Sequence, residues 1–195
     1  MTPLLLRGLA ALVLAAPPAP PADPITWKID ATHSELSFRI RHLVSRVQGT
    51  FRDWSGTIVA DPADWNAGRT EIVIQTASID TRNEKRDTHL RSADFFDAAQ
   101  HPTITFTSTS VQVAGEQVTL TGNLTIRGVT KPVTLTGEAL GMTGEGPGKQ
   151  RIGFHVSTRI NRLDYGVSWN RAAEGGGVVL GDDVDLDITV AAVRQ

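Results

Sequence analysis

The sequence predicts an all-β domain of antiparallel strands, arranged as a sandwich or a barrel. Between Trp27 and Val190, apolar and polar residues alternate in about eight segments, with Thr or charged residues at the polar positions. Successive side chains of a strand point to opposite faces, so each segment has one dry and one wet face. Turn residues separate the segments, which favours antiparallel connections. A closed barrel of about eight strands holds either a packed core or one small ligand, and these two interiors imply different functions.

Nine segments alternate closely enough to be predicted as strands. They cover residues 25–30, 34–43, 47–60, 69–79, 102–113, 116–127, 131–140, 151–160 and 182–192. Residues 114–116 have a central Gly between two alternating segments, which is typical of a β-hairpin. We expect loops over 61–68, 141–148 and 174–177, and we expect Pro132 at the first residue of a strand, where its missing amide is tolerated.

Two consecutive segments break the period of two and predict two short helices near residues 83–99. The predicted helices cover residues 81–91 and 92–98. The first is polar and suits a surface helix with Thr81 or Asn83 as its N-cap. The second carries Phe95 and Phe96, which are placed to close one end of a barrel. A connection of this length with its own structure usually has a function.

The composition is that of one globular domain, which we assign to residues 23–195. Residues 1–22 contain an apolar run behind Arg7 and predict a secretory signal peptide, cleaved after Ala22. Its removal changes the formal net charge from −2 to 18 − 21 = −3, which gives no basis for nucleic-acid binding. The absence of Cys excludes disulfides and thiol catalysis. No later segment is apolar enough to span a membrane, so we expect a periplasmic or secreted protein without stable membrane insertion.

The motifs of common catalytic and cofactor sites are missing from the sequence. No Gly-x-Ser-x-Gly surrounds any Ser, which disfavours a hydrolytic triad. The five His residues lack the paired spacings of zinc sites, and hydrogen-bonded structural histidines are the better interpretation. The Gly-rich segments 144–148 and 175–177 lack phosphate-loop spacing. We therefore expect no metal, no cofactor and no catalytic residue.

One cluster of cationic side chains lies in the polar segment before residue 92. It contains Arg82, Lys85, Arg86, His89 and Arg91, with Glu84 and Asp87 among them. One interpretation is a solvated helix with weak ion pairs between residues three apart. The other is an anion-binding rim over the mouth of a barrel, in which Arg side chains and a helix N-terminus bind a head group. The spacing alone favours neither.

Linked motifs follow one another through the chain from residue 30 to residue 184. They are Asp30-x-x-His33-Ser34-x-x-x-Phe38-x-x-x-His42, Gly49-x-Phe51 with Gly56, Ser78-Ile79-Asp80-Thr81, Arg86-Asp87-x-His89-Leu90-Arg91-Ser92-x-Asp94-Phe95-Phe96-Asp97, His101-Pro102-x-Ile104-x-Phe106-x-Ser108, Gly122-x-Leu124-Thr125-Ile126-x-Gly128-Val129-Thr130-Lys131-Pro132-Val133, Arg162-x-Asp164-Tyr165-Gly166 and Gly181-Asp182-x-Val184. In identity and order they resemble the YceI-like family, and the resemblance covers residues from about 25 to 192. One departure is Tyr165, where Phe is frequent in the family, and a buried Tyr hydroxyl needs a hydrogen-bond partner.

This resemblance implies an extended, eight-stranded, lipocalin-like antiparallel β-barrel that is exported and binds an isoprenoid or similar lipid along its axis. The family has no general enzymatic assignment. The implied apolar lining consists of the alternating residues Leu36, Phe38, Ile40, Ile58, Ile72, Ile74, Ile104, Phe106, Leu120, Leu124, Leu135, Phe154 and Leu186. The cationic cluster then supplies a polar mouth formed by Arg82, Arg86, Asp87 and His89.

The leading hypothesis is a non-catalytic carrier of an isoprenoid or quinone-like lipid. At roughly 0.8 kcal/mol per CH₂ group, one buried isoprene unit contributes about 3–4 kcal/mol, whereas a head group at a wet rim adds about 1–3 kcal/mol, so the tail would set the affinity. A second hypothesis is an isomerase or cyclase of a prenyl-type substrate, with Asp87–His89 or Asp30–His33 as an acid/base pair. A third is a packed structural barrel with a protein partner. The sequence is also compatible with a homodimer.

Overall fold

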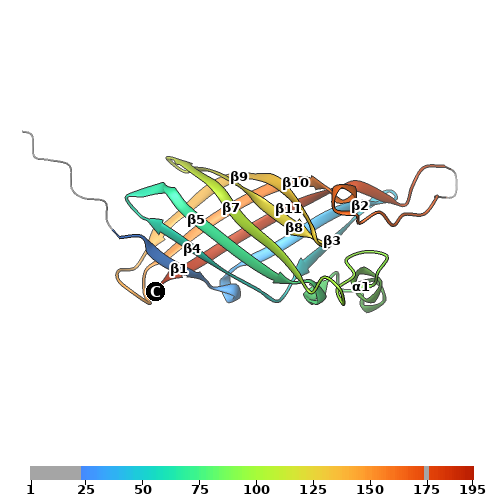
Figure 1. Ribbon diagram of the computed structural model, residues 1–195, viewed down its shortest axis with the longest axis horizontal. Helices are drawn as coiled ribbons and strands as arrows, with labels where there is room; N and C mark the ends of the chain where they lie inside the picture. The colour runs from blue at the N-terminus through green and yellow to red at the C-terminus, as the bar shows by residue number, and fades with distance from the viewer. Residues whose placement is uncertain (1–22, 174–175) are drawn as a thin grey trace, which may run out of the picture.

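The computed structural model describes residues 23–173 and 176–195, so the predicted signal peptide and part of the predicted loop 174–177 lie outside the described residues. Within these ranges the predicted all-β fold is confirmed (Figure 1). The strands are β1 (Ile25–Ile29), β2 (Glu35–His42), β3 (Ser45–Phe51), β4 (Trp54–Asp61), β5 (Asp64–Gln75), β6 (Ile79–Asp80), β7 (Thr103–Ala114), β8 (Gln117–Ile126), β9 (Val129–Thr143), β10 (Arg151–Asn161) and β11 (Leu180–Arg194). The helical elements of the described residues are α1 (Glu84–Arg91) and the 3₁₀ helices η1 (Ala31–His33), η2 (Thr76–Ser78) and η3 (Arg162–Tyr165).

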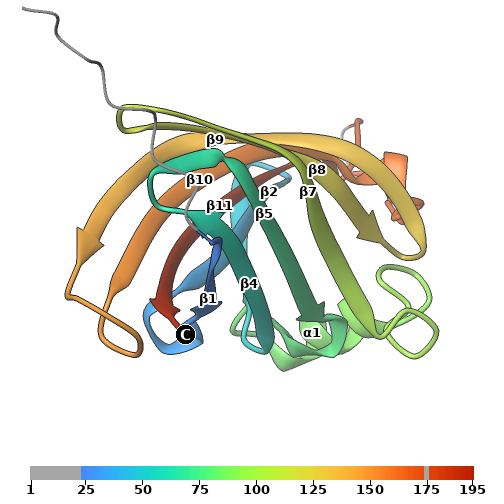
Figure 2. The same cartoon turned by 60° about the vertical axis from the view of Figure 1, so that its left-hand side comes forward.

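The strands form one closed antiparallel barrel, as predicted. Paired strands follow the order β1–β4–β5–β7–β8–β9–β10–β11, and β1 pairs with β11 to complete the ring of eight. The strands β2, β3 and β6 extend the wall, because β11 pairs with β2 between residues 180 and 189 and with β1 only at residues 192–194. Figures 1 and 2 show long strands wrapped around one interior, with α1 beside one end of the barrel.

Side chains of the Asp30-x-x-His33-Ser34 motif stabilise the turn that connects β1 to β2. The Asp30 carboxylate caps η1 by accepting a hydrogen bond from the Thr32 amide (3.1 Å), and it contacts His33 Nδ1 (2.8 Å). The Ser34 hydroxyl donates to the Asp30 carbonyl (2.7 Å) and accepts from the Ala191 amide (2.9 Å). The Ala191 amide therefore keeps a partner where β11 passes from β2 to β1. This gives the motif a structural role.

Two predicted boundaries around β4 are wrong. The segment 47–60 is two strands separated by two residues, because β3 pairs with β2 whereas β4 pairs with β1. The segment 61–68 is not a loop, since β4 and β5 meet in a tight hairpin at Pro62 and Ala63. The Asp61 carboxylate accepts a hydrogen bond from the Ala63 amide (2.8 Å) in this turn and so holds the hairpin closed.

The strand β9 also differs from its prediction at both ends. It begins at Val129, so Pro132 lies inside it, and it runs to Thr143, into the loop predicted for 141–148. Pro132 is opposite Asn123 of β8, and β10 pairs with β9 only from Thr136 onward. Pro132 is tolerated because this part of β9 is an edge, where one side of the strand makes no ladder hydrogen bonds.

The second predicted helix is absent, and residues 92–98 form consecutive turns. The Ser92 carbonyl accepts hydrogen bonds from the amides of Phe95 (3.0 Å) and Asp97 (2.9 Å), and Asp97 adopts a left-handed backbone with φ +48°. A left-handed residue cannot continue an α-helix. Among the residues described, no helix is long and apolar enough to cross a membrane.

Candidate functional site

The barrel encloses an apolar cavity of about 320 Å³. This volume lies within the range of small-molecule sites, which is roughly 300–1,000 Å³. Most of the predicted lining residues are on its wall: Leu36, Phe38, Ile40, Ile72, Ile74, Ile104, Phe106, Leu120, Leu124, Leu135 and Leu186. Each comes from the inward face of an alternating strand, which is why the period of two identified them. The cavity counts against the hypothesis of a fully packed structural barrel.

Ile58 and Phe154, also predicted to line the interior, are not part of the cavity wall. They belong to a cluster of large side chains at the barrel end opposite α1. Trp27 is fully buried, Ile58 is its cross-strand partner, and the Trp27 and Trp65 rings lie 6.1 Å apart. Phe154 packs edge-on against Trp65 at 5.8 Å. These contacts fill the space that an open channel would need, so they close this end of the barrel.

The predicted polar mouth divides into two pairs of residues. Arg86 and His89 line the cavity at the α1 end, and Arg82 and Asp87 do not. Arg82 is exposed, with φ +61° and its amide bound to the Asp80 carboxylate (2.7 Å). The sequence could not separate these residues, because a polar turn-and-helix segment has no alternating faces to assign.

Asp87 is buried and has a structural role. One carboxylate oxygen accepts hydrogen bonds from the amide (2.9 Å) and the hydroxyl of Thr81, at the entry to α1. Arg86 donates to the Thr81 hydroxyl (2.7 Å) and to the Thr81 carbonyl (2.8 Å). Two of the donor groups of Arg86 are therefore already used to fix the helix to Thr81, the residue that follows β6.

Neither of the two acid/base pairs of the enzyme hypothesis lies in the cavity as a pair. Asp30 and His33 do meet, but the His33 side chain is 68% exposed and neither residue lines the cavity. Asp87 binds Thr81, while His89 pairs with Asp94 (2.9 Å) and not with Asp87. In the described ranges, no three His, Cys, Asp or Glu side chains gather in an arrangement that could hold a metal ion.

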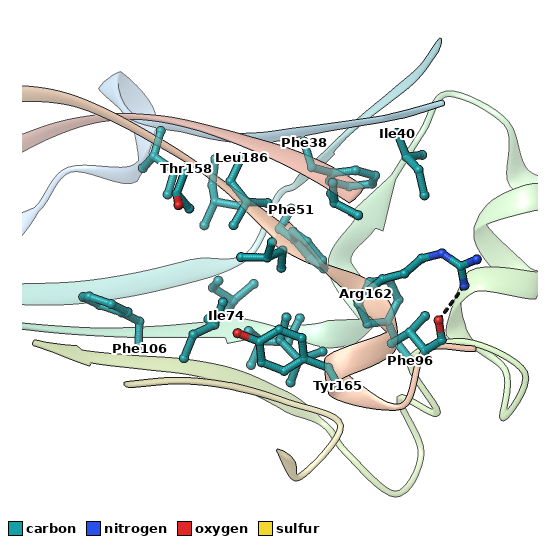
Figure 3. Close-up of a pocket in the computed structure, with 18 of the residues that line it drawn as sticks. Phe38, Ile40, Phe51, Ile74, Phe96, Phe106, Thr158, Arg162, Tyr165 and Leu186 are labelled. Carbon is teal, nitrogen blue, oxygen red and sulfur yellow. Dashed lines mark hydrogen bonds between the residues drawn. The ribbon is translucent and has the colours of Figure 1, made fainter. Parts of the chain in front are cut away.

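Tyr165, in η3, is the cavity residue that the sequence could not place. It is 2% exposed, and Figure 3 shows its hydroxyl directed into the cavity near Ile74 and Phe106. No side-chain or backbone group of residues 23–173 or 176–195 forms a hydrogen bond with this hydroxyl. Burial, followed by the nearby Asp164 carboxylate, raises the pKa of Tyr165 to about 12. The phenol is therefore neutral and a hydrogen-bond donor at ordinary pH.

Arg162, one turn earlier, holds the chain that follows η3 against the barrel. Its guanidinium donates to the carbonyls of Gly181 (2.9 Å), Val167 (2.5 Å) and Trp169 (2.9 Å) and reaches the Asp182 carboxylate (3.3 Å). Burial lowers the pKa of Arg162, and the Asp182 charge opposes this shift. In Figure 3 the guanidinium points away from the cavity interior, so Arg162 contributes its aliphatic stem to the wall.

Comparison with known proteins identifies the family. The YceI-like domain family matches residues 27–192, which is most of the chain. The chain belongs to the YceI-like family. Protein YceI of Escherichia coli O157:H7 is 39% identical over 189 residues, covering 95% of this chain and 94% of that protein. Protein YceI of Salmonella arizonae is 39% identical over 172 residues, covering 87% of both chains.

Solved structures share this YceI-like barrel. The crystal structure of the Campylobacter jejuni YceI protein matches with a TM-score of 0.69 at 36% identity, covering 80% of this chain and 90% of that chain. A domain from Saccharophagus degradans, described as a polyisoprenoid-binding domain, matches with a TM-score of 0.66 at 20% identity. That match covers 88% of this chain and 99% of the domain, and at this identity it shows the shared fold alone.

Proposed function

We propose that this protein binds an isoprenoid-type lipid inside the barrel and carries or sequesters it without catalysis. The observation that carries the proposal is the apolar cavity, lined by aliphatic and aromatic side chains from strands all around the barrel. The polyisoprenoid-binding description of the S. degradans domain, which shares the fold, supports the same ligand class.

The lining of the cavity favours an apolar chain over a compact polar molecule. Its closed end at Trp27 and Trp65 and its polar groups at the α1 end give it a direction, with the tail enclosed and the head near α1. Each buried CH₂ group contributes about 0.8 kcal/mol, so three isoprene units provide roughly 10 kcal/mol before the ordering of ligand and protein is subtracted.

The polar groups around the cavity support binding rather than chemistry. Arg162 is held in hydrogen bonds to the protein, Arg86 donates to Thr81, and His89 is paired with Asp94. A catalytic acid or base needs a free proton position facing the substrate. We further propose that the protein acts after export, on the strength of the predicted signal segment in residues 1–22. Cell fractionation tests this, since protein found only in the cytoplasm with Met1 intact contradicts it.

The binding proposal is tested with a variant that fills the cavity. Ile72 is on the cavity wall, and its neighbour Val73 is exposed on the outside of the same strand. We expect Ile72→Trp to weaken the affinity for a prenyl-chain probe at least tenfold and Val73→Trp to leave this affinity unchanged. Native mass spectrometry and titration measure the affinity. Leu120→Trp gives a second filled cavity if Ile72→Trp does not fold. Equal affinity in wild type and a folded, filled variant, or no binding by wild type, contradicts the proposal.

A further inference from the structure

We propose that the turn between β2 and β3 is a docking tip for a lipid bilayer with anionic head groups. Leu43 and Val44, which we call the β2–β3 tip, insert into the interfacial layer of the bilayer, and the arginines beside them bind its phosphate groups. The contact is peripheral, and it brings the α1 end of the barrel to a lipid surface. It does not depend on which molecule occupies the cavity.

The first observation is the exposure of apolar side chains at the tip. Leu43 and Val44 are the two residues between the strands; Val44 is fully exposed and Leu43 is 44% exposed. The Leu43 amide donates to the Val179 carbonyl (2.8 Å), which brings the exposed Val178 to the same place. Single exposed apolar residues are common on protein surfaces, whereas a group of them at a projecting turn indicates a binding surface.

The second observation is the backbone conformation of the tip. Leu43 has φ +52°, in the left-handed region that a bulky residue rarely adopts. Asn or Gly adopts it with less strain, and these are the usual residues of two-residue hairpin turns. The turn therefore keeps a large apolar side chain at a position where folding alone would favour a small polar residue. A function of that side chain outside the fold explains the choice.

The third observation is that the tip continues the inner face of the barrel. Alternate residues of β2 become more exposed toward the turn, since Leu36 and Phe38 are buried, Ile40 and His42 are half-buried, and Val44 is fully exposed. The first four of these residues line the cavity. The cavity wall therefore reaches solvent beside the tip, at the barrel end where α1 also lies (Figure 1). A bilayer that holds the tip faces this end of the cavity.

The fourth observation is the charge of the hairpin. Residues 36–52 contain no acidic residue and four arginines, Arg39, Arg41, Arg46 and Arg52. Arg41 and Arg46 each lie two residues from the tip. Arg41 donates to the Leu43 carbonyl (3.3 Å) and pairs with no carboxylate of the described residues. Arg46 is exposed and reaches Asp185 only at 3.5 Å. Cations beside exposed apolar side chains are typical of peripheral binding to anionic bilayers.

The size of the tip favours a bilayer over a protein partner. A stable protein interface buries about 800 Å² on each partner, which needs a broad surface. A turn of two residues is too narrow for that, whereas it can enter the interfacial layer between lipid head groups. The flanking arginines then lie at the level of the phosphates.

The test measures flotation of the protein with vesicles made of equal parts phosphatidylcholine and phosphatidylglycerol, and with vesicles of phosphatidylcholine alone. We expect wild type to bind the mixed vesicles more tightly. Leu43→Asn with Val44→Ser should weaken this binding at least about tenfold, because two apolar side chains are lost. Arg41→Gln should weaken binding to the mixed vesicles about fivefold and leave binding to phosphatidylcholine unchanged.

The matched control removes two exposed apolar side chains from the closed end of the barrel. Leu140 and Met142 are exposed on β9, next to Ala139, the cross-strand partner of Phe154. Leu140→Asn with Met142→Ser should keep the vesicle affinity of wild type. Since the chain has no Cys, an environment-sensitive dye can be attached to Val44→Cys or to Met142→Cys. The dye emission should shift to the blue on mixed vesicles at residue 44 and stay unchanged at residue 142.

Three outcomes overturn the inference. In the first, wild type does not bind the mixed vesicles. In the second, the Leu43→Asn/Val44→Ser protein floats like wild type, or the control at Leu140 and Met142 loses as much binding. In the third, the tip joins two copies of the chain, so that sedimentation shows a dimer that the tip variant abolishes while vesicle binding is unchanged. Thermal unfolding checks the fold, and the tip variant should melt no lower than wild type, because Asn relieves the strain at residue 43.

Discussion

Trp65 of β5 and Phe154 of β10 meet edge to face inside the barrel, with ring centroids 5.8 Å apart and an interplanar angle of 75°. The two strands are not neighbours in the sheet, so this contact crosses the barrel interior. Edge-to-face pairs contribute about 0.5–1.5 kcal/mol beyond their buried area. Neither ring is on the cavity wall, so this contact fills the barrel interior beyond the cavity.

We therefore expect Trp65→Ala to lengthen the cavity and destabilise the fold. Removing a large, partly buried aromatic side chain should lower the free energy of unfolding by about 2–4 kcal/mol, measured by urea denaturation. Longer prenyl probes should gain affinity relative to short ones. Trp65→Phe keeps an aromatic ring at the site and serves as the control. Unchanged chain-length preference in a folded Trp65→Ala protein would show that this cluster does not limit the ligand.

Asp87→Ala should destabilise the α1 end of the barrel. The substitution leaves the buried Thr81 amide and hydroxyl without their acceptor, a loss of about 1–3 kcal/mol. Hydrogen exchange should show the effect as faster exchange in α1. Thr88→Ala, on the exposed side of the same helix, should change stability by less than about 0.5 kcal/mol. Equal stability of the two variants contradicts the structural role assigned to Asp87.

The titration of Tyr165 can be followed directly, because it is the only tyrosine of the chain. We expect the ultraviolet absorbance of tyrosinate to appear with a midpoint near pH 12 in the folded protein, compared with about 10 after denaturation. The folded pKa is the higher one, so the folded protein retains the proton longer. The stabilisation is complete below pH 10 and is lost between pH 10 and about 12, by on the order of 2 kcal/mol. A midpoint near 10 in the folded protein contradicts the buried position.

Gly137→Ala should destabilise the pairing of β9 with β10. A Cβ atom at residue 137 would overlap the carbonyl oxygen of His155 and crowd the backbone of Val156, and a backbone cannot move aside as a flexible side chain can. Strain of this kind typically lowers stability by about 1–3 kcal/mol, which thermal unfolding would detect. Thr136→Ala changes the exposed neighbouring residue and should be nearly neutral. If the Gly137→Ala and Thr136→Ala variants unfold at the same temperature, β9 and β10 do not approach each other as closely as described.

The sequence predicted the barrel and much of its cavity because alternation determines which face of a strand a residue occupies. It could not determine how far along the barrel a residue lies. Ile58 and Phe154 have the same inward orientation as Phe106, but they sit at the filled end, beside Trp27 and Trp65. The position of these residues along the barrel axis depends on the stagger between neighbouring strands. That stagger is known only when all the strand pairings are known.

Polar residues outside the strands were harder to predict for a different reason. Asp87 belongs to a charged, apparently solvated segment, and its burial depends on Thr81, six residues away across a turn. The prediction of a second helix failed because Asp97 adopts a left-handed conformation, which sequence patterns rarely indicate for a residue other than Gly. Tyr165 attracted notice only as a departure from the family pattern, and its direction became visible with η3 in place.

The pairing of β11 has a consequence for when the enclosed interior of the barrel can form. This fifteen-residue strand contacts β10 on one side and both β2 and β1 on the other, so it joins the first strands of the described chain to the last. Without β11, the strands β10, β2 and β1 each lose a partner, and the interior is not enclosed. An enclosed interior therefore exists only after β11 has been synthesised and has paired with these three strands.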